Sequence, residues 1–142
     1  MTDAEKIAAL IRYRLEQARE ALAAAELNLA NGLERSAINR AYYAMFYAVL
    51  ALLAERTIET SRHSGVLAQF DLLYVKPQVF RAEMSRSLHR AFLHRQAADY
   101  GAETALTRSE IESLTTEART FVAEVRTYFE RQAPGSPTPG NP

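Results

Sequence analysis

The stretch Ala37-Ile-Asn-Arg-Ala-Tyr-Tyr-Ala-Met-Phe-Tyr-Ala-Val-Leu-Ala-Leu-Leu-Ala54 decides the fold. It contains no Gly or Pro, is rich in good helix formers, and carries no charge between Arg40 and Glu55. Apolar side chains recur at the three- and four-residue spacing of one helical face, and aromatic side chains make the opposite face apolar too. The first face consists of Ile38, Ala41, Tyr42, Met45, Ala48, Val49, Leu52 and Leu53. A helix that is apolar nearly all round is a buried helix, so we expect the other helices to pack around this one.

The same stretch is short and rich in Tyr compared with a membrane-spanning helix, which needs about 20 predominantly apolar residues. We therefore expect no membrane association. The beginning of the chain lacks the basic start and apolar run of a signal peptide, which favours a cytoplasmic location.

Capping signals divide the remainder of the chain into helices. Thr2 with Glu5, and Thr107 with Glu110, fit capping boxes, and Asn31-Gly32 is typical of a helix end. The predicted helices are residues 3–30, 33–56, a short one starting at Ser61 or Ser64 and ended by Pro77, 78–100 and 108–132. No segment alternates between apolar and polar with period two, so no strand is expected.

These elements predict an all-α, up-down bundle of four long helices plus one short helix, because short loops make sequential helices antiparallel. The bundle occupies residues 1–132 of the 142. Residues 133–142 are rich in Pro and Gly and have nothing apolar to bury, so we expect a disordered tail.

Composition excludes several classes of site. The formal net charge is zero, unlike that of a general nucleic-acid coat protein. With no cysteine there is no disulfide, thiolate metal site or thiol nucleophile. His63, His89 and His94 do not have metal-ligand spacing, and we interpret His89 and His94 as solvated helix residues. We expect neither a metal nor a cofactor.

Arg95, Asp99 and Tyr100 form the first candidate site. Arg95 continues the apolar stripe of its helix, and Asp99 lies one turn further on. A plain ion pair explains this spacing, but a carboxylate in the last turn of a helix opposes the helix dipole. The functional interpretation is that Arg95 holds a phosphate while Tyr100, Asp99 or a nearby His handles a proton.

Two further groups are candidates for ligand binding. Arg40, Tyr43 and Tyr47 form a row on the central helix. The alternative to ligand binding is that these three side chains form a hydrogen-bond network in the core. Arg62 and His63 lie at the head of the short helix, where they could form an anion site or simply a solvated cap.

Three blocks of the sequence together resemble the HEPN domain, in particular its small stand-alone prokaryotic members. The blocks are Ser36-Ala-Ile-Asn-Arg-Ala-Tyr-Tyr-Ala-Met-Phe-Tyr-Ala48, Arg62-His-Ser-Gly-Val-Leu67 and Ala91-Phe-Leu-His-Arg-Gln-Ala-Ala-Asp-Tyr100. The resemblance covers about residues 3–132 and implies a helical bundle that forms a homodimer. Many members of the family are toxins or defence ribonucleases, and others are paired with a minimal nucleotidyltransferase.

The resemblance assigns the family's motif arginine to Arg95. Ribonuclease members carry a histidine four to six residues after that arginine, and here Tyr100 stands in its place. His63 lies seven residues after Arg56, which nominally satisfies the spacing, but at a different place in the bundle. Since Tyr has an unperturbed pKa near 10, it is a weak base at neutral pH.

Two functional hypotheses follow, beside a third interpretation in which the chain is a purely structural helical dimer. In the first, the protein is a toxin–antitoxin or defence module that binds RNA, or cuts it as a metal-independent endoribonuclease, at a dimer cleft. In the second, it is a non-catalytic partner of a minimal nucleotidyltransferase, binding a nucleotide or presenting Tyr100 for adenylylation.

Overall fold

The computed structural model describes residues 1–60, 62–101 and 106–132, and within them it confirms an all-α bundle without strands. The long helices are α1 (Asp3–Ala30), α2 (Glu34–Glu55), α4 (Ala82–Asp99) and α5 (Arg108–Gln132). A short helix, α3 (His63–Phe70), continues into a π-helical turn, Asp71–Val75. The expected tail, residues 133–142, lies outside the described residues.

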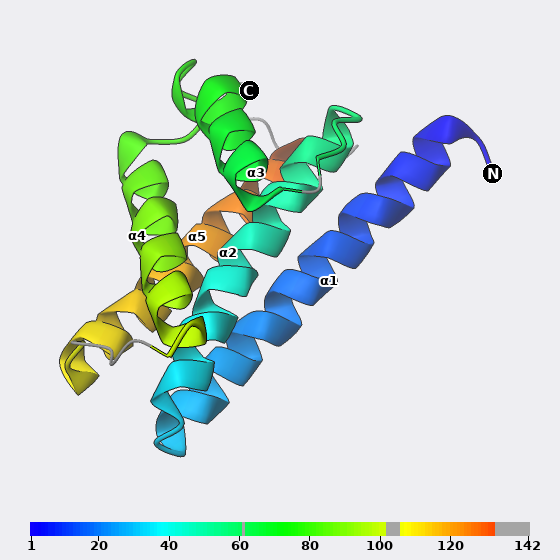
Figure 1. Ribbon diagram of the computed structural model, residues 1–142. Coiled ribbons are helices and arrows are strands. Elements are labelled where there is room, and N and C mark those ends of the chain that lie inside the picture. Colours follow the sequence, from blue (N-terminus) through cyan, green and yellow to red (C-terminus); the bar gives the residue numbers. More distant parts are fainter. Residues whose placement is uncertain (61, 102–105, 133–142) are drawn as a thin grey trace, which may run out of the picture.

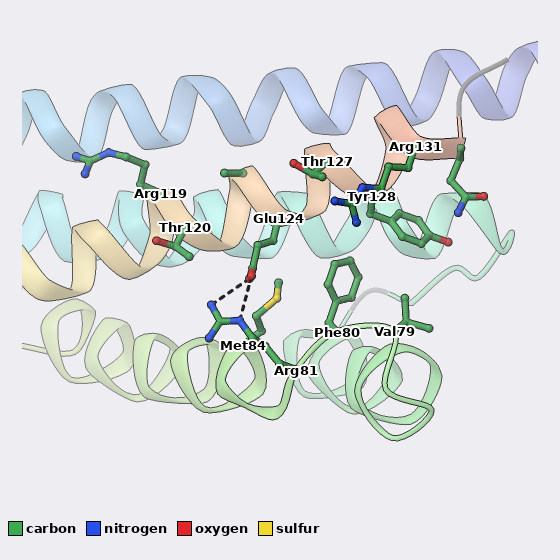
Figure 2. Close-up of a pocket in the computed structure, with 12 residues that line it drawn as sticks. Val79, Phe80, Arg81, Met84, Arg119, Thr120, Glu124, Thr127, Tyr128 and Arg131 are labelled. Atoms are coloured by element: carbon green, nitrogen blue, oxygen red, sulfur yellow. Dashed lines mark hydrogen bonds and ion pairs between the residues drawn. The ribbon is translucent and has the colours of Figure 1, made fainter. Parts of the chain in front are cut away.

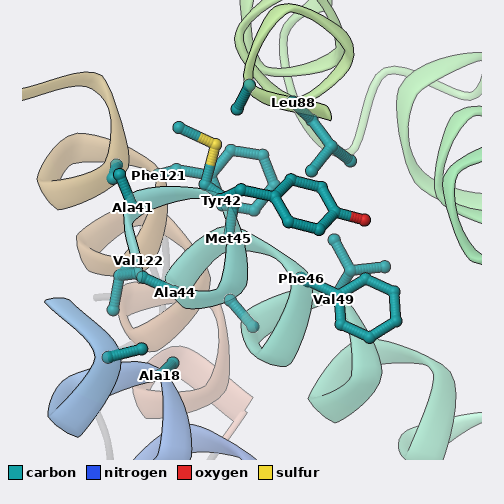
Figure 3. Close-up of a cluster of buried hydrophobic side chains, with 14 of the residues drawn as sticks. Ala18, Ala41, Tyr42, Ala44, Met45, Phe46, Val49, Leu88, Phe121 and Val122 are labelled. Carbon is teal, nitrogen blue, oxygen red and sulfur yellow. The ribbon is translucent and has the colours of Figure 1, made fainter. Parts of the chain in front are cut away.

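Helix α2 is the centre of the bundle, as its sequence predicts. It lies between α1 and α4, with α5 crossing behind it (Figure 1), and it contacts each of these helices and α3. Tyr42, Met45, Val49 and Leu52 are all 0% exposed, which confirms the predicted buried face. Figure 3 shows this part of the core, where Phe121 of α5 and Leu88 of α4 close over α2.

Small side chains bring α1 and α2 together. The three buried residues of α1 are all alanines, Ala18, Ala21 and Ala25, and they share one core with Ala37, Ala41, Ala44 and Ala48 of α2. Larger apolar residues of α1, such as Leu15 and Leu22, pack at the edge of this core. An Ala-rich seam gives α2 a close neighbour without requiring a wide apolar stripe on α1.

Local capping explains where α1 begins and ends and where α5 begins. The Thr2 hydroxyl accepts a hydrogen bond from the Glu5 amide, and the Glu5 carboxylate accepts one from the Thr2 amide, so both halves of the capping box are present. Gly32 follows α1 with φ +74°, and the next amide, that of Leu33, donates to the Asn28 carbonyl at 2.8 Å. Thr107 and Glu110 cap α5 in the predicted manner.

Two helix starts differ from the prediction. Helix α4 begins at Ala82 rather than at residue 78, because Gln78 has φ +65° and cannot continue a right-handed helix. Phe80 is buried too, but it lies in the loop before α4. Helix α3 begins at His63 with Arg62 as its N-cap residue and no side-chain cap, so Ser64 is not the cap. The alternative cap, Ser61, lies outside the described residues.

The hydropathy of α2 differs from the expectation that this stretch is too short and too rich in Tyr to span a membrane. Its most apolar 18-residue stretch has a mean hydropathy of 1.3, so by length and composition α2 would suffice to cross a membrane, contrary to the expectation from length. However, 72% of this 18-residue stretch is buried inside the fold. The packing of α1, α4 and α5 around α2 therefore accounts for its composition.

Buried tyrosines make stability sensitive to alkali. Tyr74 and Tyr128 donate hydrogen bonds of 2.7 Å to the Leu52 carbonyl and to the Glu55 carboxylate. Burial, followed by the charge of Glu55, raises the pKa of Tyr74 from 10.0 to about 12. Burial and Glu55 likewise raise the pKa of Tyr128. A raised pKa means that the folded state holds these protons more tightly, so their contribution is complete below pH 10 and is lost above it, through about pH 12 for Tyr74.

We therefore expect the urea midpoint of unfolding to fall between pH 8 and pH 11, and to fall less in Tyr74→Phe. Equal midpoints at the two pH values would contradict this coupling.

Candidate functional site

Arg95 of α4 lies against the aromatic surface of α2. Its guanidinium carbon is 5.3 Å from the ring centroid of Tyr42, 5.7 Å from that of Tyr43 and 5.8 Å from that of Phe92. Its Nη1 donates to the Tyr43 hydroxyl at 3.1 Å. The Arg95 side chain is 14% exposed, so the aromatic rings hold a permanently charged group in a largely dehydrated position.

Asp99 and Asn39 connect this arginine to Arg40. An Asp99 oxygen lies 3.4 Å from Arg95 Nη1, and the Asn39 amide donates to Asp99 at 3.2 Å. Arg40 Nε donates to the Asn39 amide oxygen at 3.0 Å, and the Arg40 guanidinium lies 4.9 Å from the Tyr43 ring. We call Asn39, Arg40, Tyr43, Arg95 and Asp99 the Arg95 cluster; it holds two arginines and one carboxylate.

The cluster is not fully satisfied by its own partners. Arg95 Nε is buried and has no hydrogen-bond acceptor among the described residues. A buried donor without a partner costs about 1–3 kcal/mol. The 14% of the side chain that is exposed can still meet an acceptor, and oxyanions match its fork of donors.

His63 reaches the same aromatic surface from the start of α3. Its Nδ1 lies 2.7 Å from the Tyr42 hydroxyl, and its ring stacks on Phe46 at 4.4 Å between centroids. Burial, and then the charge of Arg95, lower the pKa of His63. Burial raises the pKa of Tyr42. At neutral pH the pair is therefore an uncharged imidazole and a protonated phenol.

The structure brings together five of the eight residues predicted as site residues. Arg40, Tyr43, Arg95 and Asp99 share one network, and His63 lies beside it across the Tyr42 ring. Tyr47 stands at the edge, with its ring 5.7 Å from that of Tyr43.

Tyr100 and Arg62 lie apart from the cluster. Tyr100 is 83% exposed and makes no side-chain hydrogen bond among the described residues, because α4 ends at Asp99 and the chain turns away. Arg62 borders a different hollow of about 670 Å³, between α1 and the end of α2. Within the described chain, Tyr100 therefore does not share the site of Arg95.

Sequence reasoning missed two members of the site. Tyr42 was assigned to the core alone, although a buried hydroxyl needs a partner, and here that partner is His63. Asn39 was not singled out, although it precedes Arg40 and bridges two charged groups. His89 also differs from a plain solvated residue, since its Nε2 lies 2.8 Å from Asp71.

Other features of the surface lie elsewhere. A hollow of about 650 Å³ between the start of α4 and α5 is lined by Phe80, Met84 and Tyr128 and bordered by the ion pair Arg81–Glu124 (Figure 2). It contains no predicted site residue. Within the described ranges, no three His, Asp or Glu side chains gather in a way that could hold a metal ion.

Comparison with known proteins identifies the family. The sequence matches the family model of the HEPN domain over residues 11–128. It is 37% identical to a UPF0332 protein of Thermotoga maritima, over 92% of this chain and 96% of that one. It is 35% identical to each of two Methanocaldococcus jannaschii proteins named "Putative toxin", over 81% and 86% of this chain and 78% and 87% of theirs. With a bundle of this kind and a match over most of its length, the chain is a member of the HEPN domain family.

Proposed function

We propose that this protein is a toxin-like HEPN protein that binds RNA through the Arg95 cluster, as part of a toxin–antitoxin or defence system. The observation that carries the proposal is the Arg95 guanidinium, held against two tyrosine rings with its Nε unpaired. The names of the two archaeal relatives support the toxin-like part. The choice of RNA rests on the match of Arg95 to the motif arginine of the family's ribonuclease members.

The arrangement of the cluster suits a phosphodiester. Arg95 supplies paired donors to the phosphate oxygens, and Arg40 adds a second positive charge, 4.9 Å from the Tyr43 ring. Asp99 occupies Arg95 in the free protein, so phosphate must compete with this carboxylate. His63 is close enough to the aromatic surface to contribute a hydrogen bond or a proton, and it is mostly neutral at pH 7.

The first test uses the purified full chain, total RNA and a short fluorescent single-stranded RNA, with EDTA present. We expect the short RNA to bind with an affinity that falls as salt rises, because its phosphates are the ligand. Cleavage of total RNA under the same conditions would extend the proposal to metal-independent ribonuclease activity. Failure to bind the RNA at low salt, with the protein folded, would overturn the proposal.

We expect a homodimer that pairs the exposed side of α4. Leu93, a large apolar side chain on this helix, is 63% exposed. Light scattering at micromolar concentration should give twice the monomer mass. Leu93→Asp should return the monomer, whereas Leu10→Asp, at an exposed apolar residue of α1, should remain dimeric. A monomeric parent protein would contradict this expectation.

A second candidate function rests on the position of Tyr100. An exposed phenol at the end of α4, free of hydrogen bonds among the described residues, is accessible to a modifying enzyme. In this alternative the partner is a minimal nucleotidyltransferase that adenylylates Tyr100. Mass spectrometry after incubation with such an enzyme and ATP should then show one added AMP, absent in Tyr100→Phe and retained in Tyr13→Phe, which removes another exposed tyrosine. Modification of both variants would exclude Tyr100 as the target.

A further inference from the structure

The hydrogen bond between Tyr42 and His63 has a direction that the surroundings determine. Tyr42 is 0% exposed, and no other described residue accepts a hydrogen bond from its hydroxyl. If His63 Nδ1 carried a proton, the buried Tyr42 hydroxyl would have no acceptor for its own proton, at a cost of about 1–3 kcal/mol. The satisfied arrangement is therefore the phenol donating to an unprotonated Nδ1.

A neutral imidazole has one proton, so an accepting Nδ1 places that proton on Nε2. His63 is partly exposed, and no described residue lies within hydrogen-bonding distance of its Nε2. Stacking on Phe46, with an interplanar angle of 10°, limits rotation of the ring. Tyr42 thus fixes both the orientation and the tautomer of His63.

We propose that Tyr42 is a positioning residue that holds His63 as an Nε2–H donor, so that His63 binds an oxyanion together with Arg95 rather than serving as a base. The inference rests on the proposed function for the identity of that oxyanion, an RNA phosphate. Tyr42 contacts both residues, because Arg95 lies over its ring and His63 is hydrogen-bonded to its hydroxyl.

The charges around His63 agree with a donor role. Arg95 of α4 is the charged group whose field reaches the imidazole, and it disfavours the imidazolium form. From α2, Tyr42 and Tyr43 face the ring through uncharged phenols, and Phe46 covers it. Arg62, the preceding residue, is exposed. A neutral N–H beside a guanidinium can bind an anion without requiring a second charged group to be buried there.

The test is a nitrogen-15 NMR measurement on the full chain at pH 7.5, which reads the tautomer directly. The chain has three histidines, so His89→Gln and His94→Gln assign the His63 signals. We expect the Nε2–H tautomer in the parent protein and a shift of the Nε2–H signal on adding inorganic phosphate at constant ionic strength. Arg95→Ala should remove the phosphate response.

Tyr42→Phe keeps the ring in the core and removes only the hydroxyl. We expect it to change the His63 tautomer ratio and to weaken phosphate binding by roughly threefold to tenfold, the effect of one hydrogen bond. Tyr74→Phe is the matched control, since Tyr74 is equally buried, donates a bond of the same 2.7 Å length to Leu52, and should leave His63 unchanged.

A parent protein with the proton on Nδ1, or an Nε2–H signal insensitive to phosphate, would overturn this inference. An unchanged His63 signal in folded Tyr42→Phe would also overturn it. If the parent protein shows the Nε2–H tautomer and its phosphate response but does not bind RNA, the RNA proposal fails while the assignment of Tyr42 and His63 stands.

Discussion

Replacing Met45 with Asp should unfold the domain. Met45 is 0% exposed and lies at the middle of α2, in a core built from α1, α2, α4 and α5. Met45 belongs to the apolar core cluster, so a carboxylate there would be buried among apolar side chains or would have to bind a proton. We expect a loss of about 3–5 kcal/mol, a large part of the stability of a domain of this size.

Urea unfolding followed by circular dichroism measures this loss. Leu27→Asp is the control, because Leu27 is 64% exposed on α1 and the same substitution there should change stability by about 0.5 kcal/mol or less. A Met45→Asp protein as stable as Leu27→Asp would mean that α2 is not the centre of the fold.

Replacing Arg95 with Ala should abolish high-affinity RNA binding. Truncating one partner of a largely buried charged contact typically costs 2–5 kcal/mol, which corresponds to a loss of roughly 30-fold or more in affinity. Any RNA cleavage should disappear with it. The measurement is fluorescence anisotropy with the short single-stranded RNA.

Arg90→Ala is the matched control, because it removes the same charge from the same helix. Arg90 is 45% exposed on its side chain and pairs with Glu117 at 2.6 Å, outside the Arg95 cluster. Arg95→Lys adds a second comparison, since Lys keeps the charge but lacks the fork of donors and the flat surface that stacks on Tyr43. Equal loss in Arg90→Ala and Arg95→Ala would assign RNA binding to general surface charge instead.

Much of the fold is readable from local patterns in the sequence. The face of α2 that contains Met45 follows from apolar spacing, and the start of α1 and the start of α5 follow from capping residues whose hydrogen bonds form within four residues. The start of α4 was not predictable in the same way. Gln78 adopts a positive φ that neither its side chain nor Pro77 requires, and Phe80 packs equally well from a loop.

In the candidate site, too, contacts within one helix were predictable and contacts between helices were not. The contact of Arg95 with Asp99 was predictable because both lie one turn apart on a single helix. The approach of His63 to Tyr42 was not, since it depends on how α3 packs against α2 from 21 residues further along the chain. Tyr100 shows the opposite limit, because helix spacing suggests a direction for its side chain, but the helix ends one residue earlier.

The central position of α2 has a consequence for biosynthesis. Helix α1 leaves the ribosome first and can cover one side of α2, whereas α5, which covers another, is made last. Until then the nascent chain displays a segment apolar enough to resemble a membrane span. The described bundle therefore cannot close around α2 until α5 has been made.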